Sequence, residues 1–177
     1  MANERIISAD SHVAIREDAV LEHLSTKYHE GYKQSPLEYI QRMMARAKRN
    51  ASAELPIGAG DKPWEAAGRP GEYDPTERLK DMDTDGVEAE VLYSDVEAGV
   101  CFNTMTDGGR LAAFRAFNDA ALAFSSADPK RLLVVYLVPI VDMNEAVGEV
   151  QRLAREGARA FMLPLYPTDL DLPPYFD

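Results

Sequence analysis

Short apolar runs alternate with amphipathic segments along much of this chain. Four runs rich in β-branched and other apolar residues have the character of strands, and they occupy residues 5–9, 89–93, 132–138 and 159–163. The segments that precede the last three runs carry apolar residues at helical spacing, and they occupy residues 74–86, 107–128 and 142–157. Strands that alternate with helices in this way predict a parallel sheet with right-handed crossover connections.

The boundaries of these helices carry local signals. Asp74 supplies an N-cap acceptor, Pro75 suits the first helical position, and Glu77 is placed to complete a capping box. Gly86 is a residue of the kind that ends a helix. The same capping-box spacing recurs at residues 142–145. The sequence therefore predicts where two of the helices begin as well as that they exist.

An excursion of about residues 16–74 separates the first strand from the first crossover helix. Two short helices are predicted in it, over residues 19–24 and 36–44, and the second has its proline in the first turn. From 50 to 71 Gly, Pro and Ala are frequent, which predicts a long loop around Trp64. We interpret this loop as a lid whose Trp64 contacts a substrate; the alternative is that the ring anchors the loop to the body of the protein.

Four strand and helix units are half of a (β/α)8 barrel. The chain has 177 residues, 46% of them hydrophobic and 28% charged, which suits one domain with a sizeable core. A whole barrel usually takes about 250 residues. The chain therefore corresponds either to the N-terminal portion of a barrel or to a small open sheet. We expect an α/β fold of TIM-barrel type in which residues 1–177 form the N-terminal part of a single barrel domain.

The charge balance narrows the expected partners. Thirty acidic against nineteen basic residues give a formal net charge of −11, and such a surface repels phosphate backbones and anionic lipid. The single cysteine excludes an internal disulfide. No basic segment followed by an apolar run opens the chain, and no apolar stretch approaches the roughly 18 residues of a membrane span. We expect a cytoplasmic protein that acts on a small molecule, not on nucleic acid or a membrane.

Candidate chemistry is concentrated where the first strand ends. Asp10 and His12 are two positions apart, so an extended strand directs both side chains to the same side. A carboxylate oxygen and a neutral imidazole nitrogen suit a divalent ion such as zinc. The alternative is that Asp10 starts a turn that His12 caps. Because ligands of parallel sheets lie at the carboxyl ends of strands, Tyr93 and Ser94 are added as candidate substrate contacts.

Residues 6–13 (IISADSHV) and 78–93 (RLKDMDTDGVEAEVLY) together resemble the opening of the amidohydrolase-related family. The branch concerned includes aminocarboxymuconate-semialdehyde decarboxylase and related aromatic-acid decarboxylases and hydrolases. Residues 131–139, and the step into the fourth strand at 156–160, are similar too. The resemblance covers most of the chain apart from the excursion, and its specificity lies in the combination of these motifs.

The resemblance implies a metal-dependent barrel in which Asp10 and His12 are two of the metal ligands. Zinc is the expected metal, with manganese as an alternative. The resemblance also implies a histidine after the fifth strand, commonly another after the sixth, and an aspartate at the end of the eighth. The catalytic residues are therefore expected downstream of Asp177. The implied chemistry is hydrolysis or decarboxylation of a small carboxylated or cyclic substrate, through a metal-activated water or a Lewis-acid metal.

A half barrel also has consequences for assembly. It exposes unpaired edges at its first and fourth strands and apolar faces that a second half would cover, so we expect a homo-oligomer, aggregation or a partner segment. A competing class is a small non-catalytic α/β binding or assembly domain, or an inactive truncated fragment, in which Asp10 and His12 are structural. The metal content of the chain separates the two classes.

Overall fold

The computed structural model describes residues 5–49, 69–94, 102–106, 108–139 and 141–163. Its strands are β1 (Ile6–Val13), β2 (Val87–Ser94), β3 (Leu132–Leu137) and β4 (Ala160–Met162). Its α-helices are α1 (Glu17–His23), α2 (His29–Arg49), α3 (Pro75–Asp85), α5 (Gly109–Ser125) and α6 (Met143–Arg155). The described residues also include the short 3-10 helices η1 (Thr26–Tyr28), η3 (Pro70–Glu72) and η4 (Phe102–Thr104).

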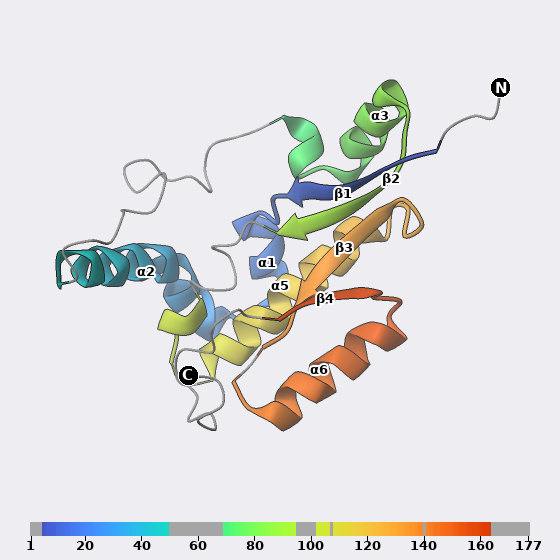
Figure 1. Cartoon of the computed structure of the whole chain (residues 1–177). Coiled ribbons are helices and arrows are strands. Elements are labelled where there is room, and N and C mark those ends of the chain that lie inside the picture. The colour runs from blue at the N-terminus through green and yellow to red at the C-terminus, as the bar shows by residue number, and fades with distance from the viewer. Residues whose placement is uncertain (1–4, 50–68, 95–101, 107, 140, 164–177) are drawn as a thin grey trace.

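The four strands form one parallel sheet in the order β1-β2-β3-β4. Figure 1 shows the strands side by side, with α3, α5 and α6 packed along the sheet. Each of the first three strands is therefore followed by a crossover that returns the chain to the same end of the sheet. The predicted α/β architecture of four successive units is confirmed.

Two hydrophobic clusters form the core of the described residues. The first joins Val13 and Leu92 of the sheet to Met82 of α3, Phe124 of α5 and Leu153 of α6. The second lies among the helices of the excursion and α5, and its buried members include Val20, Leu24, Tyr32, Phe102 and Phe117. Side chains alternate between the faces of a strand, so the neighbours of Val13 and Leu92 point to the opposite face of the sheet.

A β-bulge lies in the middle of β1. Ser8 pairs with Glu90 and Ser11 with Leu92, so β1 holds one more residue than β2 over this stretch. The bulge explains why the Oγ atoms of Ser8 and Ser11 lie 2.7 Å apart. In a regular strand, side chains three positions apart would point to opposite faces.

A second irregularity, of the opposite sense, lies at the start of β1. Ile6 pairs with Val87 and Ile7 with Ala89, so here β2 holds the extra residue. The two irregularities cancel. Both ends of β1 consequently keep the same offset from β2, and only the short stretch between them is displaced.

The caps predicted for the crossover helices are present. The Asp74 side chain accepts hydrogen bonds from the backbone N–H groups of Thr76 and Glu77, and Gly86 ends α3 in the left-handed conformation. The reciprocal half of the predicted box is replaced, because the backbone N–H of Asp74 donates to the carbonyl of Pro70. Asp142 caps α6 in the same manner, through the N–H groups of Asn144 and Glu145.

The prediction for the second helix of the excursion is wrong about its start. Helix α2 begins at His29, and Pro36 lies inside it instead of in its first turn. Proline has no N–H to offer the carbonyl four residues earlier. That carbonyl belongs to Tyr32, and the buried hydroxyl of Ser35 donates to it over 2.8 Å. The neighbouring serine thus satisfies the acceptor that the proline leaves open.

A buried asparagine fixes the carboxyl end of β3. The Asn118 side chain, on α5, donates to the carbonyl of Leu137 over 2.9 Å and accepts from the Leu137 N–H over 3.0 Å. Its amide also donates to Glu149 of α6 over 3.1 Å. One side chain therefore ties two helices to the last residue of a central strand.

Over the described part of the chain, no helix is both long and apolar enough to cross a lipid bilayer.

Candidate functional site

Asp10 and His12 meet at the carboxyl end of β1. Their Oδ1 and Nε2 atoms lie 4.0 Å apart, and their side chains are 92% and 55% exposed. Both residues belong to the strand itself, so the alternative in which Asp10 starts a turn is wrong. The alternation of β1 directs Val13 into the helical layer and His12 to the opposite, open face.

The donor set suits a divalent metal ion. Two donors bound at 2.0–2.2 Å to a tetrahedral ion lie roughly 3.4 Å apart, so a small rotation of two exposed side chains brings this pair to bonding geometry. Among the residues that the structure describes, no group of three His, Cys, Asp or Glu side chains is placed to hold a metal. Asp10 and His12 thus form at most half of a ligand set.

The predicted substrate contacts lie in different places. Tyr93 pairs with His12 in the sheet, and the two ring centroids are 6.5 Å apart, so both side chains share the open face. Ser94 pairs with Val13 and is 2% exposed, which places it on the helix-covered face. Its hydroxyl has no hydrogen-bond partner among the described residues. Trp64 lies outside the residues that the structure describes.

Sequence reasoning missed an ion pair directly behind the Asp10 and His12 motif. Arg78 of α3 donates through Nε to Glu90 of β2, and the two side chains are only 13% and 11% exposed. Arg78 also donates through Nη1 to the backbone carbonyl of His12 over 3.1 Å. A basic residue one turn into a capped helix looks like an ordinary surface position, so only the tertiary structure reveals this contact.

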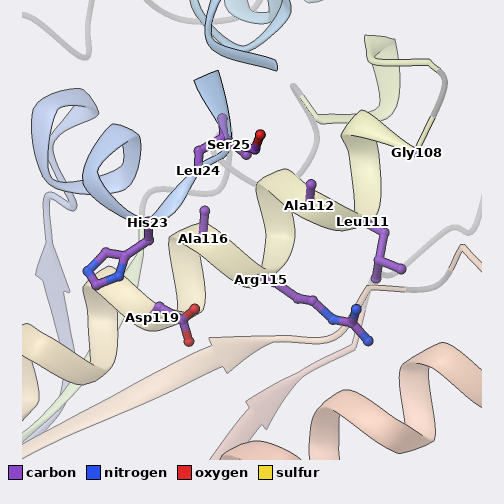
Figure 2. Close-up of a pocket in the computed structure, with 9 residues that line it drawn as sticks. All are labelled: His23, Leu24, Ser25, Gly108, Leu111, Ala112, Arg115, Ala116 and Asp119. Carbon is purple, nitrogen blue, oxygen red and sulfur yellow. The ribbon is translucent and has the colours of Figure 1, made fainter. Parts of the chain in front are cut away.

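The structure also contains a cavity of about 320 Å³ between α1 and α5, with His23, Arg115 and Asp119 at its polar edge. Figure 2 shows Arg115 directed away from His23, toward α6, where its Nη2 donates to Glu145 over 2.8 Å. Asp119 pairs with Arg152 over 2.7 Å. These charges already have protein partners, and the cavity does not include Asp10, His12 or Tyr93. The cavity is therefore separate from the candidate site at the end of β1.

Glu149 of α6 is the centre of a buried polar network. It is fully buried and accepts from Arg152 through both oxygens, over 2.7 and 2.8 Å, and from Asn118. Arg115 lies 3.5 Å from it. Burial raises the pKa of Glu149, but the hydrogen bonds from Arg152 and Asn118 and the charges of both arginines lower it more, and the net pKa is below the ordinary 4.5.

This network predicts a loss of stability in acid. A carboxyl group whose pKa is lower in the folded than in the unfolded state stabilises the fold above its unfolded pKa, and this stabilisation disappears as the pH falls further. We expect the difference in unfolding free energy between wild type and Glu149→Gln to be largest at neutral pH and to shrink below about pH 4.5. Urea unfolding between pH 7 and pH 3 measures it. Glu145→Gln, at a half-exposed position of α6, is the control, and an equal pH effect in both variants would contradict the prediction.

The fold and the site together define a class: an α/β protein with a parallel sheet in the order β1-β2-β3-β4 and with Asp10 and His12 at the carboxyl end of its first strand. Comparison with one solved structure agrees at the level of fold. An amidohydrolase from Mycobacterium avium subsp. paratuberculosis K-10 matches with a TM-score of 0.60 and 16% identity, over 91% of this chain and 50% of that chain. The structure of 2,6-dihydroxybenzoate decarboxylase from Rhizobium matches with a TM-score of 0.48 and 18% identity, over 89% and 38%.

The chain thus has the fold of part of an amidohydrolase and spans about half the length of the first of these proteins. The predicted likeness to the amidohydrolases is confirmed for the fold. No family model and no curated protein matches the sequence.

Proposed function

We propose that this chain is the N-terminal half of a metal-dependent hydrolase or decarboxylase of the amidohydrolase type. The observation that carries the proposal is the convergence of Asp10 and His12 on the open face, at the carboxyl end of β1. In barrels of this kind, the residues that perform the reaction come from the carboxyl ends of the strands. The amidohydrolase fold of the chain supports the same function.

The described residues of the site have distinct roles in this proposal. Asp10 and His12 bind a divalent ion, zinc in the first instance and manganese as the alternative, through a carboxylate oxygen and a neutral imidazole nitrogen. The bound ion would supply an activated water or act as a Lewis acid. Tyr93 lies on the same face as His12, which supports a role for it in contacting a small carboxylated or cyclic substrate. The remaining ligands and the proton-transfer groups come from the other half of the barrel.

A partner half barrel is therefore part of the proposal. In the described part of the chain, β1 and β4 are the outer strands of the sheet, and Ile6 and Ile7 of β1 are 52% and 59% exposed. Unpaired apolar edges of this kind associate. We expect the isolated chain to be a homo-oligomer in light scattering. A monomer at high concentration with one cooperative melting transition would contradict the need for a second half.

Zinc binding tests the metal site directly. The purified chain is titrated with zinc in a calorimeter, beside an Asp10→Ala/His12→Ala variant. Because two donors leave the site open, we expect the wild-type chain to bind zinc weakly, and we expect no binding by the variant, since both donors are lost. Asp18→Ala/His23→Ala is the matched control, since it removes another exposed Asp and His pair, on α1.

The outcomes separate the classes of function. Zinc that depends on Asp10 and His12 supports the metal-dependent enzyme, and the loaded protein is then assayed for turnover of carboxylated aromatic, amide and lactone substrates. Zinc that is absent from the wild type, or bound equally by the variant, would instead favour a non-catalytic domain in which Asp10 and His12 are structural.

A further inference from the structure

The ion pair between Arg78 and Glu90 lies on the helix-facing side of the sheet, directly behind the proposed metal ligands. Arg78 comes from α3 and Glu90 from the centre of β2, and both are nearly buried. Removing two charges from water is costly unless each finds several partners. Such a pair at this position calls for an explanation beyond stability, because a buried ion pair is often no more stabilising than apolar residues of the same size.

Both members of the pair contact the metal-ligand segment of β1. The Arg78 guanidinium donates from Nε to Glu90 and from Nη1 to the backbone carbonyl of His12 over 3.1 Å. The other carboxylate oxygen of Glu90 accepts from the hydroxyl of Ser11 over 3.4 Å. The segment that carries Asp10 and His12 is therefore hydrogen-bonded, on the helix-facing side of the sheet, at two successive residues, Ser11 and His12.

This support acts where β1 is least regular. The bulge ends at Ser11, and a bulge weakens the ladder of hydrogen bonds that would otherwise define the direction of each side chain. The planar guanidinium presents donors in fixed directions. By holding the carbonyl of His12, Arg78 restricts rotation of the backbone that carries the imidazole, and Glu90 does the same for the preceding residue.

We propose that Arg78 and Glu90 are positioning residues that fix the orientation of His12 for metal binding. The metal part of this inference rests on the proposed function, but the orientation of His12 can be measured without metal. Neither residue is a ligand, because both lie on the opposite face of the sheet from the imidazole.

The test compares Arg78→Lys with Arg131→Lys. Lysine keeps the charge but cannot donate to Glu90 and to the His12 carbonyl in the fixed geometry of the guanidinium. Arg131 is a matched control, because it also bonds to Asp83 and to two carbonyls of β2, those of Val87 and Glu88, but at the opposite end of the strand. Both substitutions remove comparable bonds, so a general loss of stability affects both.

Two measurements are made on each protein. The first is the imidazole carbon–proton NMR signal of His12 in the metal-free chain, assigned by its loss in His12→Gln. The second is the dissociation constant for zinc by calorimetry. We expect Arg78→Lys to shift or broaden the His12 signal and to weaken zinc binding about tenfold, as loss of a group that orients a metal ligand does. Arg131→Lys should leave both unchanged.

The proposal is overturned if the His12 signal is the same in Arg78→Lys and wild type, or if Arg131→Lys perturbs it equally. If Arg78→Lys shifts or broadens the His12 signal but the wild type binds no zinc, the proposed function fails. The positioning of His12 by Arg78 then still stands. The two claims are therefore tested separately.

Discussion

Replacing Asn118 with leucine is expected to lower the free energy of unfolding by about 3 kcal/mol or more, because stranding a buried polar group costs about 1–3 kcal/mol. Asn118 is fully buried, and leucine has a similar size. The substitution leaves the N–H and the carbonyl of Leu137 without this partner and removes one donor to Glu149. Urea unfolding followed by circular dichroism measures the loss.

Asn144→Leu is the matched control for this prediction. Asn144 lies in the first turn of α6 and is exposed, and exposed substitutions usually change stability by about 0.5 kcal/mol or less. Similar unfolding midpoints for Asn118→Leu and wild type would show that the end of β3 finds other partners.

Removing the carboxylate of Glu90 is also expected to lower the free energy of unfolding by a large amount. Glu90→Ala leaves the Arg78 guanidinium nearly buried and without its charged partner. Breaking a buried ion pair from one side costs about 3–5 kcal/mol. The reason is the desolvated charge left behind, together with the lost packing of the glutamate side chain. Thermal and urea unfolding of the purified variant measure the loss.

The double variant Arg78→Met/Glu90→Leu tests the reason for that loss. It removes both charges and keeps most of the apolar volume, so we expect it to be more stable than Glu90→Ala alone. If the double variant is less stable than Glu90→Ala, the cost comes from lost contacts and not from an uncompensated charge. The pair then contributes more to stability than we infer.

The sequence predicted the ends of helices correctly where they are set by interactions between residues a few positions apart. The N-cap at Asp74, the left-handed Gly86 and the cap at Asp142 act within a few residues, and each is present. The pairing of Asp10 with His12 depends on strand periodicity alone and is also observed. The start of α2 was missed because Ser35, and not the position of Pro36 in a first turn, makes the proline acceptable.

The polar interior could not be predicted, because its partners are far apart in sequence. Asn118 reads as one polar residue on an otherwise apolar helix, yet it binds the end of β3. Glu149 reads as an exposed charge in an amphipathic helix, yet it is fully buried. The separation of Ser94 from Tyr93 was predictable, because adjacent residues of a strand lie on opposite faces; only which of the two lies on the face of His12 depends on the register of β1 with β2.

The cancelling irregularities of β1 bear on how the length of this gene can change over generations. Deleting Ala9 would remove the bulge and leave His12 opposite Tyr93, whereas one residue inserted between Ser11 and His12 would turn the imidazole toward the helix-covered face. We expect inherited insertions and deletions to be tolerated on the amino-terminal side of Asp10 and eliminated from Asp10 to the end of β1. The bulge thus lets the start of the chain vary in length while the metal-binding segment keeps its place.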